Sequence, residues 1–188
     1  MQGIDKISAI DAVNSAISQG VTSAEAVRAH GYYTATCFDA DGKELWQEHM
    51  FPNLVTTVGK NDLLDKYMAG SAYTAALYIG LIGATSYTTG ANAADTMASH
   101  TGWVEDQNYS QANRPTTAWS AAAAGSKALS AALVFSINAT TTIKGCFMTT
   151  VNTKGGTTGI LYSAGLFTGG DQPAVNGNTL NVSYTAGA

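Results

Sequence analysis

The chain has 188 residues, 45 % of them hydrophobic, which is enough to fill one hydrophobic core in a single domain. Its formal net charge is −4 and its Lys and Arg residues form no cluster, which argues against nucleic acid as a partner. It has no run of about 18 apolar residues, and its N-terminus lacks the basic and apolar segments of a secretory signal. We therefore expect a soluble protein made in the cytoplasm, with neither nucleic acid nor a membrane as its partner.

The charged residues are concentrated toward the N-terminus, with 14 of the 22 in residues 1–66 and 8 in residues 67–188. Small residues dominate the composition, since Ala, Thr, Gly and Ser together make up 89 of the 188 residues. This mixture suits tight turns and half-buried strands better than long surface helices. The composition therefore predicts a mainly β protein with small, closely packed side chains.

Residues 1–30 are predicted to form a helical N-terminal arm. Branched apolar residues recur there at spacings of three and four, which places them on one face of a helix: Ile4, Ile7, Ile10, Val13 and Ile17. Thr22–Glu25 has the spacing of a capping box and predicts a second short helix. Two destinations for the isoleucine face remain open: the sheet of its own domain, or a partner subunit to which the arm binds.

Residues 31–188 are predicted to form one β-rich domain that begins with a hairpin over residues 31–50. The residues alternate in character over Tyr32–Phe38 and Lys43–Met50, and Asp39–Gly42 supplies the turn between them. An Asp-x-Asp-Gly fragment also occurs in calcium loops, but the remaining ligands and the terminal Glu are missing here. The turn is therefore the favoured interpretation.

An internal helix and an apolar strand are predicted next. A β-branched run, Leu54–Val58, precedes the helix, and Tyr73–Ile82 is the strand, in which Gly80 leaves room for a close neighbour. Residues 83–114 then form a long polar loop, of the kind that is usually functional or ordered by contacts. We expect the helix to lie in the core, because its apolar residues share one face: Leu63, Leu64, Tyr67 and Met68.

Strand signals return after Pro115, separated by turns rich in Gly and Asn. Their spacing of about 12 to 18 residues favours an antiparallel β-sandwich or jelly roll over a parallel sheet. The predicted strands are Thr116–Ser120, Lys127–Ile137, Thr142–Val151, Ile160–Phe167 and Thr179–Thr185.

Catalytic and metal-binding patterns are not legible in the sequence. The three histidines, His30, His49 and His100, have no adjacent nucleophile or second ligand. Cys37 and Cys146 are far apart and neither belongs to a Cys-x-x-Cys motif, so both are interpreted as buried thiols. We expect a protein that is not an enzyme and that uses no metal and no cofactor.

The most site-like segment lies in the long loop, where Asp95, His100 and Glu105 could converge. A single histidine with scattered carboxylates is a weak signal, so we favour a loop held in place by the side chains of His100 and Trp103. The glycine-rich segment 154–159 lacks the order of a phosphate-binding loop and predicts a turn. A third possibility is that aromatic rings of the loop stack on sugar, with Tyr87, Trp103 and Tyr109 as the candidates.

Several sequence blocks, distinctive in combination, occur between about Phe51 and the C-terminus: Asn53–Asp65, Tyr78–Ile82, Tyr109 with Arg114–Pro115, Ser136–Thr140, Gly145–Phe147, Gly159–Tyr162 and Gly177–Thr185. Through these blocks the chain resembles a family of small virion proteins of tailed bacteriophages. The first 50 residues show the least likeness to this family.

The resemblance implies a capsid decoration, or cement, protein that lies on the outside of the head and bridges capsomers. Its implied partners are the major capsid protein and copies of itself, as a homodimer or homotrimer, and its location is the capsid surface of the virion. The alternative is a tail or fibre-tip component that binds a host-surface glycan through the aromatic residues of the long loop.

Overall fold

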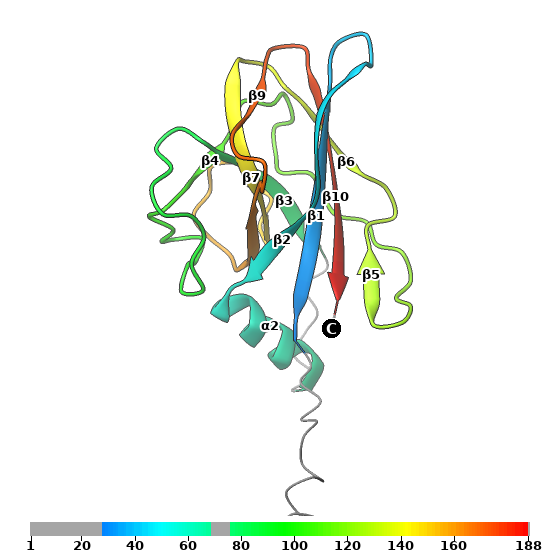
Figure 1. The fold of residues 1–188 in the computed structure, drawn as a ribbon. Coiled ribbons are helices and arrows are strands. Elements are labelled where there is room, and N and C mark those ends of the chain that lie inside the picture. The colour runs from blue at the N-terminus through cyan, green and yellow to red at the C-terminus, as the bar shows by residue number, and fades with distance from the viewer. Residues whose placement is uncertain (1–27, 69–75, 188) are drawn as a thin grey trace, which may run out of the picture.

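The computed structural model describes residues 28–68 and 76–187 as a mainly β protein built on one large antiparallel sheet of ten strands (Figure 1). The strand order is β4-β3-β7-β8-β2-β1-β10-β5, while β6 also pairs with β10 and β9 with β7. The strands are β1 (His30–Phe38), β2 (Glu44–Val55), β3 (Tyr78–Gly83), β4 (Val104–Asp106), β5 (Ser126–Ala128), β6 (Leu133–Ser136), β7 (Thr141–Thr149), β8 (Leu161–Leu166), β9 (Gln172–Ala174) and β10 (Thr179–Gly187).

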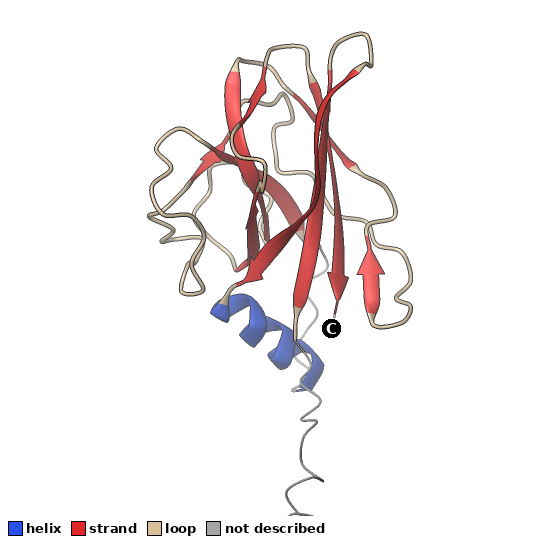
Figure 2. Cartoon of the chain, in the orientation of Figure 1, coloured by secondary structure: helices blue, strands red, loops and turns tan. Residues whose placement is uncertain are grey.

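The predicted helical arm lies outside the described residues except for residues 28–30, and His30 is already the first residue of β1. Among the described residues the helix is α2 (Thr57–Met68), which lies at one end of the strands (Figure 2). No helix in the described part of the chain is long and apolar enough to cross a membrane.

The predicted N-terminal hairpin is confirmed, since β1 and β2 pair in antiparallel fashion. The turn forms because the Asp39 carboxylate accepts hydrogen bonds from the backbone N–H groups of Asp41 and Lys43, at 3.0 and 2.9 Å. Gly42 adopts a φ of 81°, a left-handed conformation that glycine reaches without steric cost.

Strand β2 is longer than predicted and pairs with two different neighbours. Its first part pairs with β1 as far as Pro52, and Asn53–Val55 pair with β8. The change of neighbour follows a bulge at Met50, whose φ is 48°. The predicted separate run Leu54–Val58 is therefore wrong, because its first two residues end β2 and Thr57 begins α2.

The later strands follow the predictions with corrections. Strand β9 was not predicted, and the predicted loop 83–114 contains the short strand β4, because both are three-residue segments whose strand character depends on pairing with β7 and β3. Segment 127–137 is split into β5 and β6, because both pieces pair with β10 at different positions and the residues between them loop out. Segment 116–120 forms no strand and makes only isolated bridges, through Thr116 and Trp119. Of the predicted strand Tyr73–Ile82, residues 73–75 lie outside the described residues and β3 starts at Tyr78. The predicted close neighbour of Gly80 is the ring of Phe147.

One hydrophobic core is shared by strands that are far apart in the sheet order. Side chains from β1 and β10 pack with side chains from β3 and β7, so distant parts of the sheet enclose the same core. The aromatic pair Tyr33 and Tyr184, with ring centroids 4.6 Å apart, connects β1 to β10 within it. Both cysteines are fully buried in this core, as predicted from their isolation in the sequence.

Stability is expected to fall at alkaline pH because several buried thiols and phenols keep their protons to a higher pH in the folded state than in the unfolded chain. Burial raises the pKa of Cys37 from 9.0 to about 11, and burial also raises the pKa values of Cys146, Tyr33 and Tyr184. Above pH 9 the unfolded chain loses these protons first, so unfolding becomes more favourable as pH rises toward 11.

The measurement is the melting temperature by circular dichroism between pH 7 and pH 11. We expect a constant value up to about pH 8, a fall above pH 9, and a shallower fall for Cys37→Ala, in which one of these acids is absent. A melting temperature that stays constant to pH 11 would contradict the prediction.

Candidate functional site

Helix α2 is tied to the sheet by its first residues. Thr56 is its N-cap, since the Thr56 hydroxyl accepts a hydrogen bond from the backbone N–H of Gly59 at 3.0 Å. The same hydroxyl donates to the backbone carbonyl of Leu161 at the start of β8. Gly59 is the buried residue of the helix, and it lies directly over the backbone of Tyr162. The helix is therefore attached to β8 through a threonine and a glycine, not through its large apolar residues.

Replacing Gly59 with alanine is expected to lower the free energy of unfolding by about 1–3 kcal/mol, because the added methyl group collides with the backbone carbonyl of Tyr162. In an unconstrained helix the same change is stabilising by up to about 1 kcal/mol. The matched control is Asn61→Ala, at an exposed position of the same helix. Urea denaturation of both variants checks the prediction, and a stabilising Gly59→Ala would show that α2 does not pack closely on β8.

The large apolar residues of α2 are exposed, which corrects the prediction of a core helix. The exposed fractions of Leu63, Leu64, Tyr67 and Met68 are 42, 51, 83 and 75 %. The helical period placed these residues on a common side, but it could not tell whether that side meets the sheet. Contiguous exposed apolar residues on a surface are typical of contact sites for other protein segments.

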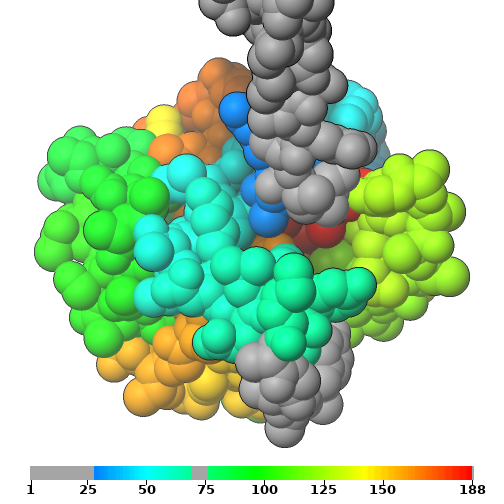
Figure 3. Space-filling view, turned by 90° about the horizontal axis from the view of Figure 1, so that it is seen from below, coloured from blue at the N-terminus to red at the C-terminus, as the bar shows by residue number. Residues whose placement is uncertain are grey.

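An apolar groove of about 370 Å³ runs beside α2. Seen from this end, α2 crosses the face and the segment that carries β5 lies to one side of it (Figure 3). Leu63 and Tyr67 form the α2 wall of the groove, and Tyr184 and Ala186 contribute from β10. The remaining apolar lining comes from elsewhere in the fold: Leu77, Trp119, Met148 and Tyr162.

Charge is confined to a few side chains of the groove: Asp62, Lys66 and Lys127. Burial raises the pKa of Tyr162, with a smaller contribution from the Asp62 carboxylate, and burial also raises the pKa of Tyr184. Both phenols therefore stay neutral at physiological pH. The volume of the groove falls within the range of ligand pockets, which is about 300–1,000 Å³. Its lining is mostly apolar, with one acidic and two basic side chains.

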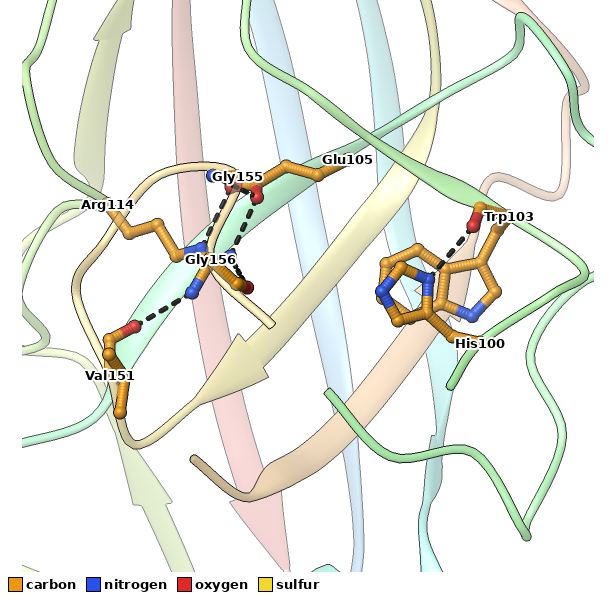
Figure 4. A network of polar contacts seen from close by, with 7 residues as sticks. All are labelled: His100, Trp103, Glu105, Arg114, Val151, Gly155 and Gly156. Carbon is orange, nitrogen blue, oxygen red and sulfur yellow. Dashed lines mark hydrogen bonds and ion pairs between the residues drawn. The ribbon is translucent and has the colours of Figure 1, made fainter. Parts of the chain in front are cut away.

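The long loop packs on the sheet through a second, smaller hydrophobic cluster. Trp103 is 1 % exposed, and its indole N–H donates to the Asp95 carboxylate at 3.0 Å. The His100 ring stacks on Trp103 with centroids 4.0 Å apart, and its Nδ1 donates to the Trp103 carbonyl at 2.9 Å (Figure 4). The prediction that His100 and Trp103 hold this loop in place is confirmed. Met97 joins the cluster from the loop, and the strands contribute Ile82 from β3, Phe147 from β7, and Leu161 and Ala164 from β8.

The aromatic residues considered for sugar stacking do not form a shared exposed platform. Trp103 and Tyr109 are 1 % and 0 % exposed, so neither ring presents a face to solvent. Tyr87 is partly exposed, and the Lys144 ammonium lies 5.2 Å from its ring centroid. The structure does not bring the three rings together at the surface.

The carboxylates near His100 have different partners. Asp95 binds Trp103, whereas Glu105 forms a two-pronged ion pair with Arg114, at 2.8 and 2.7 Å (Figure 4). His30 and His49 are exposed on β1 and β2, away from this loop in sequence. Among the described residues, no three His, Cys, Asp or Glu side chains gather in a way that could hold a metal ion.

Arg114 is the centre of a buried polar network that the sequence reasoning missed. Its side chain is 0 % exposed and that of Glu105 is 7 % exposed. Arg114 also donates to the backbone carbonyls of Val151 and Gly156, each at 2.9 Å, and Glu105 accepts from the backbone N–H of Gly155 at 2.7 Å. The available signal was the rarity of charge, since only 8 charged residues occur in 67–188.

Lys154 makes a second attachment in the same region. Its ammonium donates to the backbone carbonyls of Tyr109 and Gln111, each at 2.8 Å, and lies 4.2 Å from the Tyr109 ring centroid. The glycine-rich segment that follows is a turn, as predicted, with positive φ at Gly155 and Gly159. Together the two cations hold this turn against the end of the long loop.

A scan against protein-family models gives no match for the chain, and a search of the curated proteins gives none either.

Proposed function

We propose that the chain is a structural virion protein that decorates a tailed-phage capsid and stabilises it by bridging capsomers, without catalysis. The observation that supports this most is the exposed apolar side of α2, where Leu64 and Met68 are 51 and 75 % exposed. Such side chains find a favourable environment in contact with another protein. The major capsid protein is the proposed partner, together with copies of the chain itself as a dimer or trimer.

One of the sequence blocks that resemble phage virion proteins coincides with this surface. The block Asn53–Asp65 includes the end of β2, the cap residue Thr56, the contact residue Gly59 and the first turns of α2. The block therefore covers both the attachment of α2 to the sheet and part of its exposed side. This coincidence supports α2 as the capsid-contacting element.

The proposed role requires contacts and no reaction. Many modest contacts across capsomer seams stabilise a shell, because each bound copy raises the effective concentration of its remaining contacts. Rigid presentation of the contact surface helps, since less conformational entropy is then lost on binding. The polar network around Arg114 and the packed loop around Trp103 both support such rigidity.

We also propose that the ten-stranded sheet packs on itself as a two-layered antiparallel sandwich. The support is the shared core, to which β1 and β10 contribute from one region of the sheet and β3 and β7 from another. An experimental structure tests this proposal directly.

The functional test compares two double variants for binding to isolated phage heads that lack the protein. In Leu64→Asp/Met68→Asp the apolar side of α2 becomes charged, and we expect occupancy in cryo-electron micrographs to fall at least tenfold. Val134→Asp/Val175→Asp is the control, because both valines are 47 % exposed and lie away from α2 in sequence. Equal occupancy for both double variants, or no binding of the unmodified protein, would overturn the proposal.

A further inference from the structure

The described chain begins beside the wall of the apolar groove next to α2. Arg28, the first described residue, accepts a hydrogen bond from the His30 ring at 2.8 Å through its backbone carbonyl. His30 and Gly31 pair with Gly187 and Ala186 of β10. Ala186 lines the groove, so the preceding 27 residues are attached to the fold at the groove wall.

The preceding segment carries an apolar face without an assigned partner. Its branched residues fall on one half of a helical projection, from Ile4 to Ile17, and a helix of that length is about 21 Å long. Residues 18–27 can span at most about 33–36 Å. A tether of this reach allows the isoleucine face to fold back onto a groove that begins at its own attachment point.

The groove and the segment are also complementary in charge. Residues 1–27 contain Asp5, Asp11 and Glu25 against a single cation, Lys6. In the groove Lys66 pairs with Asp62 at 3.8 Å, so the remaining charge of its lining is the cation Lys127. In a helix Asp11 falls at the edge of the isoleucine face, one turn from Ile7. The Lys127 ammonium, which donates to the Ser120 carbonyl at 2.8 Å, lies at the groove.

We propose that residues 4–17 of the same chain form a helix whose isoleucine face occupies this groove, against Leu63, Tyr67 and Trp119. Docking within one chain is favoured over docking between copies because a short tether gives an effective concentration in the millimolar range. The groove then holds the arm, while Leu64 and Met68 on α2 stay available to another protein. The proposal does not depend on the virion assignment, since it concerns the free protein.

The test is cross-linking between one cysteine in the arm and one in the groove, in the full-length protein in dilute solution. The variant Ile10→Cys/Leu63→Cys is treated with a short bismaleimide, and the control is Ala12→Cys/Leu63→Cys, which places the thiol on the opposite side of the predicted helix. The native thiols of Cys37 and Cys146 are buried and stay unmodified. We expect at least tenfold more intrachain cross-link in the first variant than in the control.

Two results would overturn the proposal. A cross-linked dimer on a denaturing gel would mean that the occupant is the arm of a second copy. Equal intrachain yields for Ile10→Cys and Ala12→Cys, or none for either, would mean that the isoleucine face is not in the groove.

A second measurement uses thermal unfolding and needs no cysteine. Ile10→Asp/Ile17→Asp is expected to lower the melting temperature by several degrees, whereas Ala12→Asp/Ala16→Asp, with the same added charge, leaves it nearly unchanged. Combining Ile10→Asp/Ile17→Asp with Leu63→Asp is expected to give less than the sum of the two shifts, since both changes remove the same contact. Additive shifts would contradict direct contact between the arm and α2.

Discussion

Replacing Arg114 with methionine is expected to lower the free energy of unfolding by about 3–5 kcal/mol, because the change leaves a buried carboxylate without its cation. Glu105 is only 7 % exposed, so water replaces the lost partner poorly. The backbone carbonyls of Val151 and Gly156 lose their donors in the same step. A buried acceptor without a partner adds its own desolvation cost.

The geometry of the pair makes arginine specific at this position. Two guanidinium nitrogens bind the two oxygens of Glu105, and the remaining N–H groups reach the backbone of the 151–156 turn. Lysine carries the same charge but cannot make a two-pronged contact. Arg114→Lys is therefore expected to be destabilising as well, though less than methionine.

The matched control is Lys144→Met, at an ion pair more exposed than that of Arg114, with side-chain exposures of 19 % for Lys144 and 52 % for Asp171. The Lys144 ammonium lies 2.6 Å from the Asp171 carboxylate, whose side chain is 52 % exposed. Because the Asp171 carboxylate stays accessible to water, the pair is expected to contribute about 1 kcal/mol, and loss of the Lys144 contact with the Tyr87 ring adds a similar amount at most, so this variant should lose far less stability in urea than Arg114→Met. Similar losses of unfolding free energy for Arg114→Met and Lys144→Met would mean that burial does not increase the contribution of the Arg114 ion pair to stability.

A double variant separates the charge from the space that the side chains fill. Arg114→Met/Glu105→Leu removes both charges and is expected to regain part of the stability lost in Arg114→Met, because no unpaired carboxylate remains buried. A double variant less stable than Arg114→Met would instead place the main contribution of Glu105 in its contact with the Gly155 backbone.

The elements that the sequence predicted well are those decided by neighbouring residues. The hairpin turn depends on Asp39 and Gly42, and both act within four residues of their own positions. Strands β7, β8 and β10 were predicted to within one or two residues at most ends, because each is a continuous run of strand-forming residues bounded by turns. Local chemistry was sufficient in these places.

The features that the sequence could not predict depend on distant contacts. Whether the apolar side of α2 is buried depends on Gly59 meeting Tyr162, about one hundred residues away along the chain. The role of Arg114 depends on the position of the 151–156 turn, which no local pattern encodes. The groove is likewise assembled from segments spread between Asp62 and Ala186, so no sequence window contains it.

Replacing Trp103 with alanine is expected to cost about 3–5 kcal/mol of unfolding free energy, because a fully buried indole leaves a large cavity. The ring lies between His100, at 4.0 Å between centroids, and Phe147, at 5.1 Å. The Asp95 carboxylate also loses the hydrogen bond that it accepts from the indole N–H, at 3.0 Å between Nε1 and Oδ2. The long loop and strand β7 therefore lose their common packing centre.

Trp103→Phe is the control that keeps an aromatic ring but removes the indole N–H. It is expected to lose roughly 1–2 kcal/mol, from one hydrogen bond and a smaller cavity. His100→Ala should lose a comparable amount, since it removes the stacked ring and the bond to the Trp103 carbonyl. Urea denaturation followed by circular dichroism ranks the three variants.

The same variants decide whether Trp103 acts through structure or through surface contact. If it holds the loop, loss of any binding activity in Trp103→Ala should be accompanied by the loss of stability, and Trp103→Phe should keep its binding and most of its stability. If Trp103→Ala instead kept its full stability and lost binding to a glycan, the ring would have to reach the surface, against its 1 % exposure. Measuring stability and binding on the same preparation is therefore necessary, because the two roles predict opposite results for Trp103→Ala stability.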